Sequence, residues 1–486
     1  MNQRVDVRMT SWGRISEFLG ETKIARMVMM FVLGAAGSIP LVFLTPPFQV
    51  PDEMQHFYRA YELSELRMRA QVQNGVAGDT LPQSLIQLVQ SSVYTADGIN
   101  YPITPAPIAK TLKLASIPLD KSKTQFVAFA GSAFYSPLPY LPQALGIALG
   151  RALGLGPLYL LYLGRLFNCV AALALIGFAV YVMPRAEELI LIIGLLPMCL
   201  FLYSSLSPDA SVIACALAFT ALSFSASVRR HWRPLDIVIA TGAAAVFCSL
   251  KPVYTPILLS GLVPGLFRSD EIAKAIRSHV IILTVTLGFT IGWLVFAKSA
   301  ITPPLDGARP ELQAIFVLQH PAFFVRTIVH TLRLETILSY YIEAVGTFGW
   351  LTVMIRPLSV YVLPLLSFFL VWIFGFRGTV KSSVGLSLCH IALVIASALL
   401  VMTAMYLMWT QVGQDHIEGV QGRYFLPILG LAGMAVLELA PNTCPIGPKW
   451  LALGTLSAII VIEVVAMDAT IIRAFQVLSS VHSGHY

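Results

Sequence analysis

The chain has 486 residues, of which 57% are hydrophobic and only 12% are charged. Soluble globular domains contain about 25% charged residues, so this composition excludes an ordinary soluble protein and indicates burial in a lipid bilayer. The net charge of +7 does not indicate nucleic-acid binding, because Lys and Arg lie mostly in short clusters between apolar stretches, as topology signals do. The six cysteines lie in or beside apolar stretches; neither a disulfide framework nor a Cys-ligated metal site is expected.

The apolar stretches predict an all-α polytopic membrane protein that forms a single integral membrane domain over residues 1–486. A hydrocarbon core about 30 Å thick requires about 20 apolar residues per helix. About eleven spans fit the sequence, within a range of 10 to 13. They are 24–44, 157–183, 188–204, 210–228, 235–250, 253–267, 279–298, 357–375, 384–408, 424–439 and 450–472. The first is predicted to be a retained span, because no small-residue cleavage pattern follows it.

The distribution of Lys and Arg predicts a cytoplasmic N-terminus in the inner membrane of a bacterium. Short segments assigned to the cytoplasm carry most of these residues, whereas the short external segments carry only Lys251, Arg423 and Arg473. This threading follows the positive-inside rule. The apolar segment 137–153 is predicted to be a re-entrant or interfacial helix. Counting it as a complete span would reverse the orientation of every later span and place their Lys and Arg clusters outside.

Two long external segments follow from this threading, at residues 45–156 and 299–356. Aromatic-rich stretches in both are predicted to form amphipathic helices that lie along the membrane surface. Neither segment is expected to form a separate soluble domain.

The first polar cluster follows the first predicted span directly. Pro51 is expected to open a helix, with Asp52 and Glu53 in its first turn, where the helix dipole favours anions. Helical spacing would place Asp52, His56 and Arg59 on one face. The cluster is a candidate catalytic site, and the alternative is an ordinary acidic first turn.

Two more external connections carry isolated charges. In Ser207-Pro208-Asp209, the aspartate is either a functional residue or a helix N-terminal acid. In Lys251-Pro252-Val253-Tyr254, the lysine lies at the external edge against the charge rule, and Tyr254 follows it. A snorkelling lysine would explain this position equally well.

The segment 413–425 is the third candidate region, and it includes Gln421, Arg423 and Tyr424. Two glycines ahead of Arg423 would permit close approach of the backbone to a ligand, and a guanidinium can bind two phosphate oxygens at once. The alternative is that Arg423 anchors the start of a span. Trp350 belongs either to this site or to an interfacial aromatic belt, and the role of Arg165, inside the second span, stays open.

These motifs together resemble a bacterial family of predicted membrane proteins of unknown function. The resemblance rests on PPFQVPDE with His56, Phe57 and Arg59, and on Ser207-Pro208-Asp209, Lys251–Tyr254, Gly349-Trp350 and Gln421-Gly422-Arg423-Tyr424. The family is similar in layout to the GT-C glycosyltransferases, which use polyprenyl-phosphate sugars. By this resemblance, Asp52 and Glu53 correspond to a catalytic base or metal ligands, and Arg423 and Lys251 to the groups that hold the lipid phosphate.

The resemblance therefore implies an inverting glycosyltransferase at the external membrane face. Its expected partners are the bilayer, a polyprenyl-phosphate-linked sugar, and an envelope polysaccharide, lipid or protein acceptor. A divalent cation, Mg²⁺ or Mn²⁺, would bind Asp52 and Glu53 if the enzyme uses one. The alternatives are a transporter or flippase for a lipid-linked saccharide and a non-catalytic subunit of an envelope-polysaccharide complex.

Overall fold

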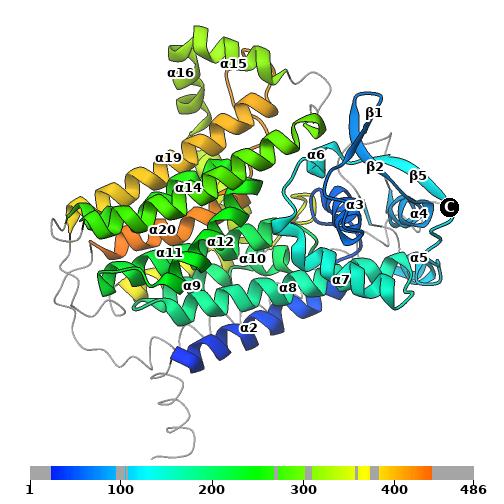
Figure 1. Cartoon of the computed structure of the whole chain (residues 1–486), viewed down its shortest axis with the longest axis horizontal. Helices are drawn as coiled ribbons and strands as arrows, with labels where there is room; N and C mark the ends of the chain where they lie inside the picture. The colour runs from blue at the N-terminus through cyan, green and yellow to red at the C-terminus, as the bar shows by residue number, and fades with distance from the viewer. Residues whose placement is uncertain are drawn as a thin grey trace, which may run out of the picture.

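The computed structural model describes residues 23–94, 104–105, 108–267, 272–301, 309–355, 359–372 and 383–439. The predicted span 450–472, most of the N-terminal basic segment and Cys444 lie outside these ranges. The described chain is mostly helical (Figure 1).

Long apolar helices lie side by side and form a bundle (Figure 1). Five of the described helices are long and apolar enough to cross a membrane, namely α2 (Lys23–Leu44), α8 (Pro157–Val182), α11 (Asp209–Arg229), α14 (Ile272–Phe296) and α19 (Val384–Met408). The number rises to six if the bent pair α15 and α16 forms one span. Helix α11 is the central one, since 89% of its most apolar window is buried inside the protein.

Shorter helices occupy several other predicted spans. The region 188–204 is divided into α9 (Glu187–Gly194) and α10 (Pro197–Tyr203), and the break falls just before Pro197, whose ring cannot continue a regular helix. The region 253–267 forms a 3₁₀ helix, η2 (Pro252–Gly261), followed by α13 (Val263–Leu266). The remaining short elements are α12 (Pro234–Leu250), α18 (Ser359–Leu370), η5 (Gly422–Phe425) and α20 (Leu426–Leu437).

The first long loop contains a small antiparallel sheet, so the expectation of helices alone in this segment is wrong. The strands β1 (Gln71–Gln73), β2 (Val76–Pro82) and β5 (Thr124–Ala128) pair in the order β1-β2-β5, with Gly78 opposite Ala128. Asn74 and Gly75 both have positive φ and connect β1 to β2. An Asn-Gly pair is a strong hairpin signal; the sequence therefore carried evidence for this sheet.

Short helices surround the sheet at the end of the bundle. They are α3 (Glu53–Ser64), α4 (Gln83–Ser92), α5 (Ile108–Leu114) and α6 (Ala130–Ala133), with a second strand pair, β3 (Val93–Tyr94) and β4 (Thr104–Pro105). Figure 1 shows the sheet and these helices beyond the end of the long helices.

The apolar segment 137–153 forms η1 (Leu138–Tyr140) and α7 (Leu141–Ala152). A helix of that length is about 18 Å long, shorter than the hydrocarbon core. It packs on the first turns of α8, where a side chain at Gly146 would collide with the carbonyl of Leu163. At its other end, Arg151 donates to the carbonyl of Ser64 in α3.

The second long loop runs sideways from the bundle before it returns. It contains η3 (Lys298–Ala300), α15 (Pro310–Gln319), α16 (Pro321–Thr331), α17 (Leu334–Gly346) and the strand pair β6 (Thr347–Phe348) and β7 (Val353–Met354). Helix α17 contacts η5 and α10, which brings this loop against the candidate site.

Candidate functional site

The ends of several bundle helices meet at one polar centre, which we define as Asp52, Asp209, Lys251 and Arg423. Asp52 precedes α3, Asp209 opens α11, Lys251 ends α12, and Arg423 lies in η5. These positions are far apart in the sequence. The structure thus brings together four of the residues that the sequence singled out.

Two ion pairs connect three members of the polar centre. The Nζ of Lys251 lies 2.5 Å from Oδ1 of Asp209, and Nε of Arg423 lies 3.9 Å from Oδ2 of the same carboxylate. The side chain of Asp209 therefore does not cap α11, whose N-cap residue is Pro208. Asp209 still lies in the first turn of α11, as a helix N-terminal acid would, but its carboxylate is paired with Lys251.

Asp52 reaches the same guanidinium from the opposite loop. Its Oδ2 lies 3.5 Å from a terminal nitrogen of Arg423, and its side chain is 36% exposed. Asp52 adopts a left-handed conformation with φ 63° and makes no side-chain cap bond to α3. An ordinary acidic first turn would place the carboxylate against the helix N–H groups, whereas here it remains partly open beside Arg423.

The ring of Tyr424 contacts both cations of the polar centre. Nζ of Lys251 lies 4.5 Å from the ring centroid, and Cζ of Arg423 lies 5.5 Å from it. Both are within the range of cation–π attraction. The hydroxyl of Tyr254 donates to the carbonyl of Tyr424 at 2.8 Å, so the ring is held in place from η2.

Arg423 is buried, yet its guanidinium is not saturated. Its Nε has no hydrogen-bond partner within the described part of the chain, and the same holds for Oε1 of the neighbouring Gln421. Buried polar atoms are normally hydrogen-bonded. Within the described residues, a donor of the polar centre and an acceptor two residues before it in the chain are therefore without hydrogen bonds.

A buried ion pair fixes the loop that presents Asp52. Arg165 donates to Oε1 and Oε2 of Glu53 at 2.8 and 2.6 Å. It also donates to the carbonyls of Val42, Thr45 and Pro46. Arg165 thereby ties the end of α2 to the start of α3, which is where Asp52 lies.

Glu53 has no oxygen left for a catalytic or metal-binding role in this conformation. Its Oε1 also accepts from the backbone N–H of Leu206 at 3.1 Å, and Oε2 accepts from Phe48 at 3.0 Å. Both oxygens thus have two donors each. Asp52 and Glu53 would bind a divalent cation together only if Glu53 gave up these contacts, and within the described residues no group of three or more His, Cys, Asp or Glu side chains could hold a metal ion.

His56 lies under the polar centre and is neutral near pH 7. Its Nδ1 lies 2.7 Å from the hydroxyl of Tyr140. Burial lowers the pKa of His56 to about 4, although Asp52 and Asp209 act in the opposite direction. His56 therefore positions its neighbours as an uncharged group.

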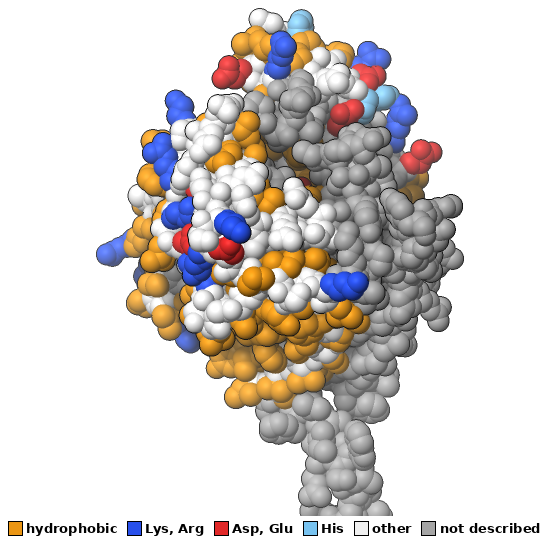
Figure 2. Space-filling model, turned by 90° about the vertical axis from the view of Figure 1, so that its right-hand side faces the viewer, with side chains coloured by type: hydrophobic (Ala, Val, Ile, Leu, Met, Phe, Trp, Pro, Cys, Tyr) orange, Lys and Arg blue, Asp and Glu red, His pale blue; other side chains and the backbone are white. Residues whose placement is uncertain are grey.

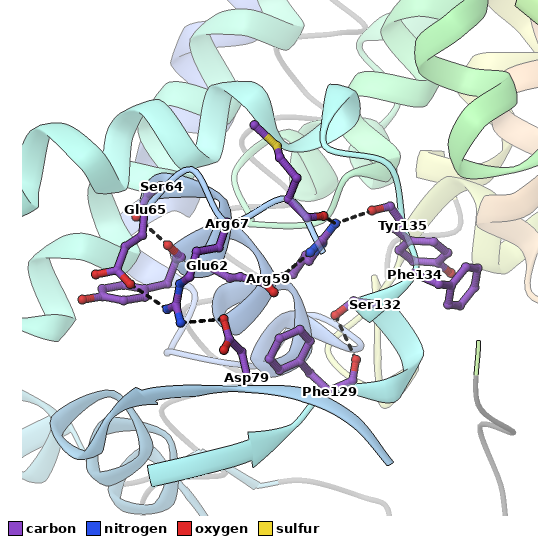
Figure 3. Close-up of polar contacts among 12 residues, drawn as sticks. Arg59, Glu62, Ser64, Glu65, Arg67, Asp79, Phe129, Ser132, Phe134 and Tyr135 are labelled. Atoms are coloured by element: carbon purple, nitrogen blue, oxygen red, sulfur yellow. Dashed lines mark hydrogen bonds and ion pairs between the residues drawn. The ribbon is translucent and has the colours of Figure 1, made fainter. Parts of the chain in front are cut away.

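Arg59 belongs to a separate network on the far part of α3 (Figure 3). Its guanidinium pairs with Glu62 and donates to the carbonyl of Tyr135 at 2.8 Å. Arg67 joins this network by contacting Asp79 of β2 at 2.8 Å. The expectation that Arg59 acts with Asp52 is not supported by contacts, because the two side chains have different polar partners.

Viewed from the end of the bundle that carries the sheet, hydrophobic side chains gather over the lower part of the described surface, and most charged side chains lie above them (Figure 2). A model for the family described as Predicted membrane protein (DUF2142) matches residues 37–432. The chain belongs to this family. All four residues of the polar centre lie inside the matched range. No curated protein and no solved structure is significantly similar to the chain.

This DUF2142 protein is a multi-pass membrane protein, and some of its site residues serve the scaffold. The Nε1 of Trp350 donates to the carbonyl of Phe48 at 3.1 Å, next to the loop of Asp52. Gly422 approaches a helix and not a ligand, since a Cβ there would lie 2.0 Å from the carbonyl oxygen of Tyr340. The glycine ahead of Arg423 is thus explained by packing on α17.

Two contacts of the DUF2142 site were not identified from the sequence. Glu343 of α17 accepts from the backbone N–H of Gly422 at 2.8 Å, and Tyr140 contacts His56. Nothing in the spacing of Glu343 indicates its partner, because the two residues are 79 positions apart. Tyr140 lies in a proline-rich aromatic segment, which is a usable signal.

Proposed function

We propose that this chain is a GT-C-like glycosyltransferase with about eleven membrane spans. It moves a sugar from a polyprenyl-phosphate donor to a cell-envelope acceptor at the external face of the bacterial inner membrane. One observation carries the proposal: a partly exposed carboxylate, Asp52, lies beside a buried arginine, Arg423, whose Nε has a long ion-pair contact with Asp209 but no hydrogen bond within the described residues. A base and an anion-binding group are the two parts that this chemistry needs.

Arg423 and Lys251 are the proposed phosphate-binding residues. The guanidinium contacts its two carboxylates at 3.5 and 3.9 Å, longer than a good charge-assisted hydrogen bond of about 2.7–2.9 Å. A phosphate oxygen can therefore form a shorter contact with Arg423 without first breaking a tight pair. Asp209 holds Lys251 in position when no substrate is bound.

Asp52 is the proposed catalytic base, and Glu53 is a positioning residue. The acceptor hydroxyl attacks the anomeric carbon, the bond from that carbon to the phosphate oxygen breaks, and its electron pair stays on the phosphate. The acceptor proton moves to Oδ of Asp52. General base catalysis of this kind contributes about 10²–10⁴-fold.

The charge balance of the polar centre suits this step. Before the reaction, the negative charges of its two aspartates equal the positive charges of Lys251 and Arg423. As the phosphate leaves it gains one negative charge, and Asp52 loses one by accepting the proton. The total charge next to Arg423 is unchanged, so the leaving phosphate is stabilised without an extra counter-ion. A single displacement predicts inversion at the sugar carbon.

The test uses purified protein in lipid nanodiscs with a radiolabelled polyprenyl-phosphate sugar and envelope fractions as acceptors. Assays are run with and without Mg²⁺ and Mn²⁺. Asp52→Asn and Arg423→Ala should abolish transfer. Asp120→Asn and Arg309→Ala, which change a half-exposed aspartate and an exposed arginine, should keep it.

Two outcomes would contradict the proposal. Transfer that survives in Asp52→Asn and Arg423→Ala would refute the assignment of these residues. An unmodified chain that moves a lipid-linked saccharide between leaflets, but transfers no sugar from any donor, would favour the transporter.

A further inference from the structure

The helices α15 and α16 have an inverted polarity. Their fully buried side chains are polar: Gln313, Thr327 and Thr331. Large apolar side chains are exposed on both helices, with Leu318 80% exposed and Val329 68% exposed, beside polar ones such as Glu311 and Arg326. A helix on a soluble surface shows the opposite pattern. The outward face of this pair is therefore built for contact with an apolar environment.

The position of the pair agrees with this pattern. Figure 1 shows α15 and α16 projecting sideways from the bundle, beside α19, and not beyond the end where the sheet lies. The two helices are bent by 107° relative to each other. At 1.5 Å per residue each is only about 15 Å long, so the bent pair is too short to cross a core about 30 Å thick.

The buried polar side chains of the pair, together with Phe324 and Ile328, contact the segment that leads to Arg423. The amide of Gln313 donates to the carbonyl of Tyr406 at 3.2 Å and accepts from the backbone N–H of Gly413 at 3.0 Å. The hydroxyl of Thr331 accepts from the N–H of Ile417 at 3.0 Å. Residues 411–417 are thus attached to α15 and α16 through buried hydrogen bonds.

We infer that α15 and α16 form a re-entrant hairpin whose outward face lies in the acyl chains of the leaflet next to the polar centre. Arg326 and His330 are exposed next to the apolar stripe of α16, and their spacing of four places them on one side of the helix. They reach the headgroup level while Val325 and Val329 lie in hydrocarbon. The bilayer thereby positions the segment 411–417 from outside the bundle.

Cysteine accessibility tests this inference directly. Val329→Cys and Leu318→Cys are compared with Val72→Cys in β1, where valine is 42% exposed. Each variant is treated with a charged maleimide in vesicles made permeable to it. Label taken up by the unmodified chain is subtracted. Only the thiolate reacts, so the two hairpin cysteines should react at least ~10-fold more slowly than Cys at 72.

A second measurement identifies what covers the hairpin. The same variants are labelled in detergent with bimane, returned to vesicles, and exposed to phosphatidylcholine brominated on its acyl chains. Fluorescence at 329 should fall strongly, and fluorescence at 72 should not change. Reaction at 329 as fast as at 72 would overturn the inference. Slow reaction without quenching would also overturn it, since protein and not lipid would then cover the hairpin.

Discussion

Replacing Arg165 by methionine should destabilise the protein more than any change at the polar centre itself. The substitution keeps an unbranched apolar stem but removes the guanidinium and its five hydrogen bonds. It leaves the carboxylate of Glu53 buried without its counter-ion, and both side chains are 0% exposed. Removing one partner of a buried ion pair costs about 3–5 kcal/mol.

The loss of donors to three carbonyls moves the expected cost toward the upper end of that range, because buried acceptors without partners are costly. A native protein is stable by only about 5–15 kcal/mol. Arg165→Met should therefore unfold at a much lower denaturant concentration than the unmodified chain, with the loop of Asp52 among the first parts to open.

The assay is an SDS titration in mixed micelles, followed by helical circular dichroism. Lys123→Met is the matched control, since Lys123 is exposed and its contact with Asp120 is 4.0 Å long; no measurable change is expected. Glu53→Gln combined with Arg165→Met should be no less stable than Arg165→Met alone, because the unpaired charge is then removed. An Arg165→Met variant as stable as the control would refute the reasoning.

Three further predictions concern the surroundings of the polar centre. Gly422→Ala should lower stability and phosphate binding together, because its Cβ would lie 2.5 Å from the N of Ala344 as well as 2.0 Å from the carbonyl of Tyr340; expression and unfolding measurements check this. Burial lowers the pKa of His56 to about 4 from 6.5. The stability that neutral His56 provides is full above pH 6.5 and is lost as the pH falls toward 4, and His56→Gln should abolish that loss in unfolding curves recorded across this range. Burial raises the pKa of Glu62 to about 7 from 4.5. Its contribution has the opposite sign, being full below pH 4.5 and lost as the pH rises through 7, and Glu62→Gln should remove this dependence, measured by proteolysis of the first loop.

The polar centre illustrates how far sequence reasoning could go. Asp52 was identified from the helix start at Pro51, Asp209 and Lys251 as isolated charges in short external connections, and Arg423 from the glycines ahead of it. Alternating helices then place their connections at the same end of the bundle. The sequence could not predict which of the neighbours Asp52 and Glu53 has a paired carboxylate and which has an accessible one. Only the position of Arg165 decides that Glu53 is fully paired and that Asp52 remains open.

The small sheet and the α15–α16 hairpin also show which features could be predicted from the sequence and which could not. The Asn74-Gly75 turn could be recognised from the sequence, because left-handed φ angles limit which residues can occupy it. The burial of polar side chains and exposure of apolar ones on α15 and α16 could not be predicted from the sequence, because the burial of Thr327 and the exposure of Val329 depend on which segments pack against them. The sequence by itself determined that this chain lies in a membrane and which residues carry its unusual charges, since transfer of side chains into hydrocarbon depends on their own chemistry. Only the tertiary structure decided which of those charges are paired, because pairing depends on contacts between segments far apart in the chain.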